Sequence, residues 1–142
     1  MRSVAPLATP QVTPQPVPQF PAAWYETLDA LRVVARRCRV APRTDLFRAC
    51  ALIANTKSAT HENYAQALFR CIGDAIGRNP VFYRPGTTEV SFDEAWLIRA
   101  VMAATEGDEG SLRFLVGSRV PKVHRRHIRF LISGIAQHAN KT

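Results

Sequence analysis

Apolar residues recur at helical spacing along most of the chain. The first run has apolar residues four and three positions apart, at Trp24, Leu28, Leu31, Ala35 and Cys38, which is the spacing of one side of an α-helix. Two more helices are predicted after Pro42, over residues 45–55 and 60–76, and Asn79-Pro80 ends the second. The side of the first of these two that we expect to face the core consists of Leu46, Phe47, Cys50, Ile53 and Ala54.

The strongest helix signals follow residue 90. Ser91 and Glu94 form a capping box, in which the Ser91 hydroxyl accepts from the amide of Glu94 and the Glu94 carboxylate accepts from the amide of Ser91. Residues 95–104 are apolar on nearly every turn, so this helix is expected to be buried on several sides. Gly107 separates it from a short helix, and Pro121 lies near the start of a long last helix.

Two segments depart from the helical pattern. Residues 81–84 and 89–90 flank a Pro-Gly turn and predict a small β-hairpin or an extended loop. Residues 1–21 hold six of the ten prolines and no acidic residue, a composition that cannot build a core. The sequence therefore predicts an all-α fold, a compact bundle of five or six helices with a small β-hairpin, in one domain over residues 22–142 after a disordered Pro-rich N-terminal tail.

The chain carries a large excess of positive charge, which bears on its binding partners. The chain has 19 lysines and arginines against 11 aspartates and glutamates, a formal net charge of +8. This excess favours a polyanionic partner: nucleic acid, an anionic membrane surface or a complex that contains nucleic acid.

The last helix concentrates positive charge on one side. At about 100° per residue, a third of its circumference holds Arg119, Lys122, Arg125, Arg126 and Arg129. No acidic residue follows Glu109, so these cations have no local carboxylate partners, and we expect them to face phosphates or an acidic protein. The alternative is a solvated face that keeps the helix soluble. The opposite side is apolar and consists of Val120, Val123, Ile128, Leu131 and Ile135, with Phe130 at its margin.

A second basic cluster lies along the first predicted helix and just after it. Its members are Arg32, Arg36, Arg39 and Arg43. If both clusters lay on one face of the fold, they would form a continuous positive surface, which the sequence leaves open. Both are candidate sites for binding nucleic acid or an acidic protein.

Residues with catalytic or metal-binding potential are few. His124, His127 and His138 share one side of the last helix, which raises the possibility of a zinc site. They fall on the apolar side, however, and His138 lies more than two turns beyond His127, too far to share one ion. We therefore expect boundary histidines that are hydrogen-bonded to neighbours, and no metal. No Gly-rich phosphate loop, Walker motif or GxSxG elbow is present, so neither an enzyme nor a cofactor is predicted.

The number and spacing of the cysteines indicate a reducing cellular compartment. Cys38, Cys50 and Cys71 are odd in number, far apart and part of apolar helical patterns, as is typical of small core residues in a reducing environment. No run of eighteen apolar residues exists, so no membrane span is predicted. The expected location is the cytoplasm.

Four runs of residues after residue 89 are similar to sequences of a known family. They are Val90-Ser-Phe-Asp-Glu-Ala-Trp-Leu-Ile-Arg-Ala, Gly107-Asp-Glu-Gly-Ser-Leu-Arg-Phe-Leu, and Ser118-Arg-Val-Pro followed by Arg125-Arg-His-Ile. Over residues 90–137 the chain resembles the carboxy-terminal half of the transcriptional activators of alphaproteobacterial gene-transfer-agent clusters. The resemblance implies a protein that engages RNA polymerase and lets it read through terminators along a long prophage-like operon, as lambdoid Q-type antiterminators do. It assigns no role to any single residue.

Three hypotheses of function follow. The first is a transcription regulator, an antiterminator that binds RNA polymerase and nascent RNA or DNA through the two arginine-rich clusters. The second is a sequence-specific DNA-binding regulator that uses residues 45–76 as a helix-turn-helix, although the turn lacks the usual glycine. The third is a basic adaptor that binds an acidic protein. The sequence leaves open the oligomeric state, the nucleic-acid site and the polymerase subunit.

Overall fold

Six α-helices make up the regular structure of residues 20–39 and 44–139, the part of the chain that the computed structural model describes (the side chains of residues 138 and 139 excepted). They are α1 (Ala22–Cys38), α2 (Leu46–Ala54), α3 (His61–Ile76), α4 (Phe92–Thr105), α5 (Glu109–Gly117) and α6 (Lys122–Ala139). The prediction of an all-α fold is confirmed. Most of the predicted tail lies outside the described residues, but Phe20, which the sequence assigns to that tail, is buried and packs edge-on against Tyr25.

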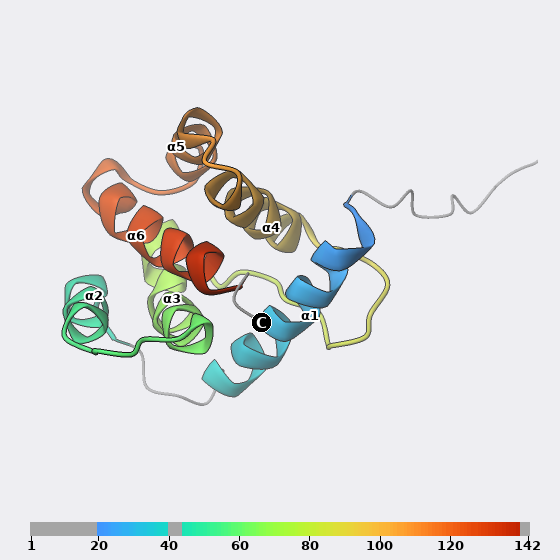
Figure 1. Ribbon diagram of the computed structural model, residues 1–142, viewed down its shortest axis with the longest axis horizontal. Coiled ribbons are helices and arrows are strands. Elements are labelled where there is room, and N and C mark those ends of the chain that lie inside the picture. The colour runs from blue at the N-terminus through green and yellow to red at the C-terminus, as the bar shows by residue number, and fades with distance from the viewer. Residues whose placement is uncertain (1–19, 40–43, 140–142) are drawn as a thin grey trace, which may run out of the picture.

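Helix α6 lies at the centre of the bundle. It contacts α2, α3, α4 and α5, while α1 packs against α3 and α4. In Figure 1, α4 and α5 lie above α6, α2 and α3 lie below it, and α1 runs along the lower right. The largest fully buried apolar side chains come from five of the helices and are Leu28, Leu31, Leu68, Ile72, Leu97, Ile98, Leu112, Ile128, Leu131, Ile132 and Ile135. These side chains belong to one core cluster.

Helix α4 begins and ends as its local sequence predicts. The amide of Glu94 donates to the Ser91 hydroxyl at 3.1 Å, and the amide of Ser91 donates to the Glu94 carboxylate at 3.0 Å. Gly107 follows the helix with a φ of 74°, a left-handed conformation that glycine adopts without strain. Between these ends only Phe92 and Arg99 are exposed, so the expectation of a helix buried on several sides is confirmed.

The predicted β-hairpin is wrong, since residues 78–91 form an irregular loop. Its amides at Val81 and Tyr83 donate to carboxylates at the start of α4, at 2.7 and 2.8 Å. Two carbonyl groups in its second half accept from an arginine of α1. Because side chains satisfy these backbone groups, they need no partner strand.

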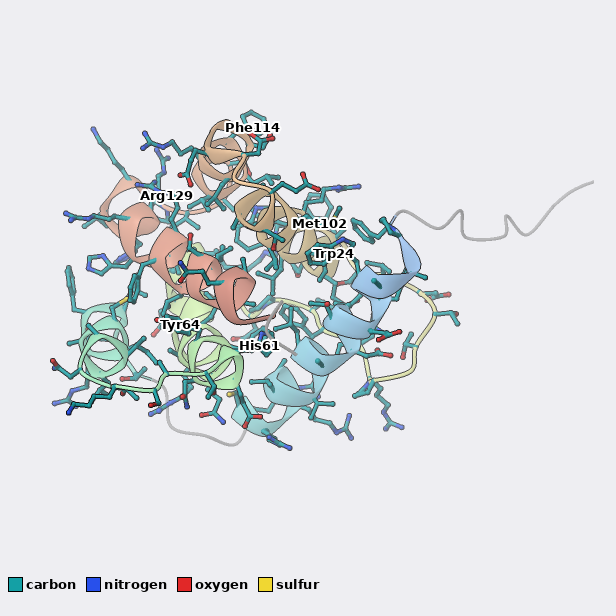
Figure 2. The ribbon with its side chains drawn as sticks, viewed as in Figure 1. Trp24, His61, Tyr64, Met102, Phe114 and Arg129 are labelled. Carbon is teal, nitrogen blue, oxygen red and sulfur yellow. The ribbon has the colours of Figure 1, made fainter. Side chains whose placement is uncertain are left out.

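Helices α3 and α6 approach each other most closely at Tyr64 and Gly134. The Tyr64 ring lies where a Cβ atom on residue 134 would be, and it packs edge-on against Phe130 at 5.8 Å. One turn away, Nδ1 of His61 lies 3.4 Å from the carbonyl oxygen of Ile135. Figure 2 shows Tyr64 and His61 on the α3 side of this contact. The contact therefore requires glycine at position 134.

Replacing Gly134 with alanine should destabilise the fold, because the new methyl group would overlap the Tyr64 ring. We expect a loss of about 1–3 kcal/mol, measured by urea unfolding. The matched control is Gly110→Ala in α5, where the nearest atom to an added Cβ is 3.8 Å away; this change should be neutral or stabilise by up to about 1 kcal/mol. Equal effects of the two changes would contradict the close approach of α3 and α6.

Candidate polyanion-binding surface

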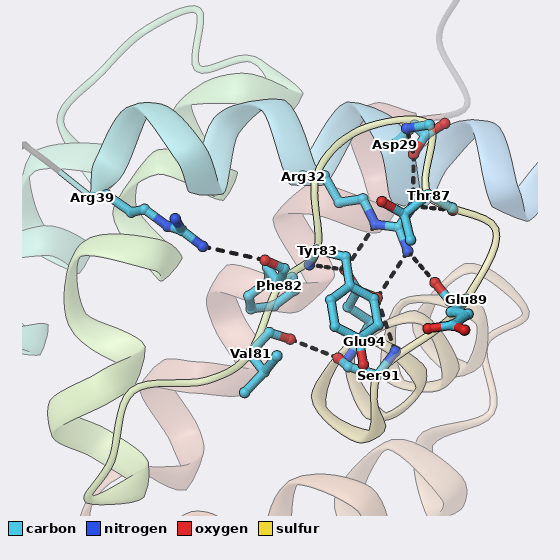
Figure 3. Close-up of polar contacts among 11 residues, drawn as sticks. Asp29, Arg32, Arg39, Val81, Phe82, Tyr83, Thr87, Glu89, Ser91 and Glu94 are labelled. Carbon is cyan, nitrogen blue, oxygen red and sulfur yellow. Dashed lines mark hydrogen bonds and ion pairs between the residues drawn. The ribbon is translucent and has the colours of Figure 1, made fainter.

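Arg32, the first arginine of the predicted α1 cluster, is buried in an ion pair. Only 2% of its surface is exposed. Its Nε and Nη2 donate to the two carboxylate oxygens of Glu94 at 2.7 and 2.9 Å (Figure 3). The other donors reach the Asp29 carboxylate and the carbonyl oxygens of Thr87 and Glu89, at 2.8–2.9 Å. All five N–H groups are thus used, and the bonds to Glu94 raise the pKa of Arg32. Its nomination as a binding residue is wrong.

Arg119, expected on the cationic face of the last helix, lies beside Asp93 instead. Its guanidinium donates to the Asp93 carboxylate, which also accepts two hydrogen bonds from Arg78. The same guanidinium lies over the Phe92 and Trp96 rings, 4.4 and 5.4 Å from their centroids. The sequence predicts no local carboxylate partner for these cations, and the partner of Arg119 is a distant one, since Asp93 precedes it by 26 residues.

The Asp93 carboxylate is strongly held in its charged form. Burial acts to raise its pKa, but the hydrogen bonds from Arg78, the amide of Val81 and Arg119 outweigh burial and lower the pKa from 3.8 to about 2. Asp93 therefore stays ionised at any pH at which the protein would work, and the two arginines remain paired with it.

Arg125 contacts its own chain. It is half-buried, and its Nε donates to the carbonyl oxygen of Val120 at 2.7 Å. Its Nη2 donates to the carbonyl oxygen of Gly117 at 3.3 Å, at the end of α5. Since the last carbonyl groups of a helix lack intrahelical partners, Arg125 serves to close α5 and its turn into α6.

The other three cations of the last helix remain available to a partner. Lys122, Arg126 and Arg129 follow one another at four- and three-residue spacing along α6, and we call them the cationic strip. Lys122 and Arg126 are exposed, and Arg129 is half-buried; Figure 2 shows Arg129 beside the first half of α6. Within the described residues the strip forms no ion pair. The first turn of α6 contains no acidic residue, so the positive end of the helix dipole adds to the same region.

The cluster on α1 lies apart from this strip. Arg36 and Arg39 are exposed, and Arg39 donates to the carbonyl oxygen of Phe82 at 3.3 Å (Figure 3). Arg43 lies outside the described residues. In Figure 1 the carboxyl end of α1 is at the lower edge of the molecule, whereas α6 starts at the upper left. The two clusters are therefore two separate surfaces.

A groove of about 420 Å³ opens beside Arg39. Its walls include Phe69, Arg70 and Phe82, and the two aromatic rings pack edge-on at 4.9 Å. Both of its arginines interact within the protein, Arg39 with the carbonyl oxygen of Phe82.

The geometry of α2 and α3 does not support a helix-turn-helix. Helix α3 is packed against α1, α2 and α6. Its two exposed residues, Glu62 and Asp74, are both acidic, and Glu62 accepts from Arg37 at 3.0 Å. Carboxylates on this surface would face the DNA phosphates, which proteins contact mainly through arginine, lysine and uncharged donors.

His124 and His127 of the last helix are partly buried, whereas the side chain of His138 lies outside the described part of the chain. The His127 ring packs edge-on against Phe47, with 4.5 Å between centroids. Nδ1 of both His124 and His127 lacks a hydrogen-bond partner, so the expected bonds to neighbours are not made at these atoms. Among the residues searched, no three histidine, cysteine, aspartate or glutamate side chains are placed to hold a metal ion.

The cysteine thiols lie in the apolar interior. Cys50 and Cys71 are buried, and Cys38 is half-buried. Burial raises the pKa of Cys50 to about 11 and that of Cys71 to about 12. These two thiols are therefore protonated at neutral pH and poor nucleophiles.

Three apolar side chains beside the cationic strip are more exposed than the sequence predicts. Phe47 and Val123 were expected in the core, with Phe130 at its margin, but they are 59%, 65% and 40% exposed. On α6, Val123, His127 and Phe130 follow one another at four- and three-residue spacing, and Phe47 of α2 packs on the middle of this row. We call these four residues the apolar strip. A helical wheel places Val123 away from Ile128, which is the one signal in the sequence that indicates its exposure.

Comparisons with protein-family models, with curated proteins and with solved structures found no match to this chain. No helix of the described residues is both long enough and apolar enough to cross a membrane. Since the comparisons found no match, the function of this protein must be inferred from the chemistry of its surfaces.

Replacing Arg32 with methionine should strongly destabilise the fold, because Glu94 would be left as an unpaired buried charge. We expect a loss of about 3–5 kcal/mol in urea unfolding. Arg36→Met, on the same helix but exposed, is the matched control and should change stability by less than about 0.5 kcal/mol. A similar small change for both variants would refute the structural role of Arg32.

The contribution of Asp93 to stability should depend on pH. Because its pKa in the folded protein, about 2, is lower than the ordinary 3.8, the carboxylate stabilises the fold above about pH 4, and this contribution is lost as the pH falls toward 2. Asp93→Asn should therefore cost about 2 kcal/mol at pH 7. The difference from wild type should shrink in unfolding curves measured between pH 5 and pH 2. A difference that does not change over this range would show that Asp93 acts otherwise than through its charge.

Proposed function

We propose that the protein is a transcription regulator that engages RNA polymerase and nucleic acid through arginine-rich surfaces and acts as an antiterminator of a prophage-like gene cluster in the bacterial cytoplasm. The observation that carries the proposal is the cationic strip, in which Lys122, Arg126 and Arg129 lie together without an ion pair among the described residues. Arg36 and Arg39 supply a second, separate cationic surface, to which the sequence adds Arg43.

The physical basis is the release of counterions. Cations that are not neutralised by carboxylates displace the ions condensed on a phosphate backbone, which drives binding and makes it sensitive to salt. A transcribing polymerase presents nucleic acid at its channels and acidic protein surface around them. Two separate cationic surfaces suit such a composite partner, since one can contact nucleic acid while the other contacts protein.

Antitermination is the part of the proposal that the sequence resemblance supports. The resemblance covers residues 90–137, which include the whole cationic strip. A protein that travels with polymerase needs surfaces for binding and no reacting group, in keeping with thiols that are protonated and buried.

The alternative of a basic adaptor for an acidic protein also has a specific observation in its favour. The apolar strip lies directly beside the cationic strip, and exposed apolar groups next to charge are typical of protein interfaces. The antiterminator and the adaptor would use the same surface, and they differ in whether RNA polymerase is the partner.

Reversing two charges of the cationic strip should abolish binding to polymerase. We expect Lys122→Glu/Arg126→Glu to lower the recovery of polymerase subunits at least tenfold in an affinity pull-down from the native host at moderate salt, in nuclease-treated extract. Both side chains are exposed, so the fold should be retained. The matched control is Arg84→Glu/Arg99→Glu, with the same change in net charge; Arg99 lies over Phe20 at 5.6 Å, close to the start of α1.

Two outcomes would overturn the proposal. Equal loss in the control would mean that only net charge matters. Retention of a specific DNA fragment without polymerase would favour a direct DNA-binding regulator.

A further inference from the structure

The apolar strip is held in place by contacts between α2 and α6. The Phe47 ring packs edge-on against His127 at 4.5 Å, and the thiol of Cys50, one turn further along α2, lies 3.8 Å from the carbonyl oxygen of His127. The Phe130 ring is held in the same way by Tyr64 of α3, at 5.8 Å. These rings are thus fixed in orientation and still exposed to solvent.

The apolar and cationic strips run side by side along α6. Val123, His127 and Phe130 each follow a member of the cationic strip by one position, and at about 100° per residue the two rows occupy neighbouring sectors of the helix. Arg48 of α2 is also exposed. The nearby Asp45 carboxylate caps α2 by accepting from the amides of Phe47 and Arg48 at 2.9 and 3.3 Å, and it forms no ion pair with these cations among the described residues.

We propose that this combined surface of α2 and α6 binds an acidic amphipathic segment of a partner protein. Apolar side chains of the segment would cover Phe47, Val123 and Phe130, and its carboxylates would pair with Lys122 and Arg126. An amphipathic helix, with apolar residues at i, i+3 or i+4 and i+7, matches the four- and three-residue spacing of the receiving strip. The inference deepens the proposed function, on which it rests for the identity of the partner, because it assigns this surface to the protein rather than the nucleic acid in the complex.

Charge argues against two other occupants. A second copy of the chain bound through the same face would place two cationic strips against each other, in a protein whose net charge is already +8. The chain's own residues 1–21 contain no acidic residue, so they offer no carboxylate to pair with the strip.

Nucleic acid fits this surface less well than a protein does. Phosphates would pair with Lys122 and Arg126 but would leave the aliphatic Val123 uncovered. Base stacking uses aromatic rings, and each phenylalanine ring here already has one neighbouring ring in edge-to-face contact, which leaves less of its surface for a base. The centre of a protein interface, in contrast, is enriched in aromatic and apolar groups beside arginine.

A displayed library of randomised 16-residue peptides tests the inference with the full-length protein. We expect the peptides selected on wild type to be acidic and amphipathic. Phe47→Ser/Val123→Ser should weaken binding of the best synthetic peptide at least tenfold. Leu52→Ser/Phe114→Ser is the matched control and should retain binding, because these residues are 59% and 74% exposed on α2 and α5 and lie outside the two strips. Thermal unfolding of each variant checks that the fold is intact.

The outcomes separate this inference from the proposed function. Selected peptides without an acidic excess, or equal binding by both double variants, would overturn it. A (dT)20 oligonucleotide that binds only when Phe47 and Val123 are present would also overturn it, in favour of a stacking surface. Polymerase recovery does not enter this test, so loss of polymerase binding with retained peptide binding would refute the proposed function alone.

Discussion

The buried ion pair between Arg32 and Glu94 is the interaction on which the rest of the fold depends. It joins the middle of α1 to the start of α4, and the same guanidinium holds the carbonyl groups of the loop that connects α3 to α4. Such a pair is stable only when the remaining donors and acceptors are also satisfied. Here Arg32 uses every N–H group, and Glu94 also accepts from the amides of Tyr83 and Ser91. The start of α4 thus organises three segments that are distant in sequence.

The neighbouring Asp93 connects the start of α4 to the segment before α6 in a similar way. It accepts from Arg78 on the loop and from Arg119 before α6, so two consecutive carboxylates anchor three arginines. These arginines determine where α1, the loop and the start of α6 lie. The same residue type therefore serves two purposes in this protein. Arginines within reach of the α4 carboxylates maintain the fold, as Arg125 does through carbonyl groups at the end of α5 and in the turn after it. Arg126 and Arg129, which form no ion pair among the described residues, are left for partners.

Because some of the arginines serve the fold, fewer cations are available to bind a partner. Of the five cations that the sequence places on one side of the last helix, two serve the fold, and the remaining three form the cationic strip. Exposed apolar groups lie directly beside them, held by α2 and α3. A surface that combines fixed apolar groups with unpaired cations suits a partner that offers both apolar contact and negative charge. We therefore regard a protein component of a nucleic-acid complex, such as RNA polymerase, as the most suitable partner.

The sequence alone determined the helices and most of their ends, because these depend on neighbouring residues. Apolar spacing, the capping box at Ser91 and Glu94, and Gly107 all act within one or two turns of helix. Only the tertiary structure decided which charges are buried, because Arg32 and Glu94 are 62 residues apart and Arg119 and Asp93 are 26 apart. The same holds for the predicted hairpin, whose backbone groups bind side chains of distant helices instead of each other. It also holds for Phe47, which apolar character assigned to the core. How α2 docks beside α6 left this side chain exposed, and no local pattern encodes that docking. The exposure of Val123, in contrast, is indicated by its place on the helical wheel, away from Ile128.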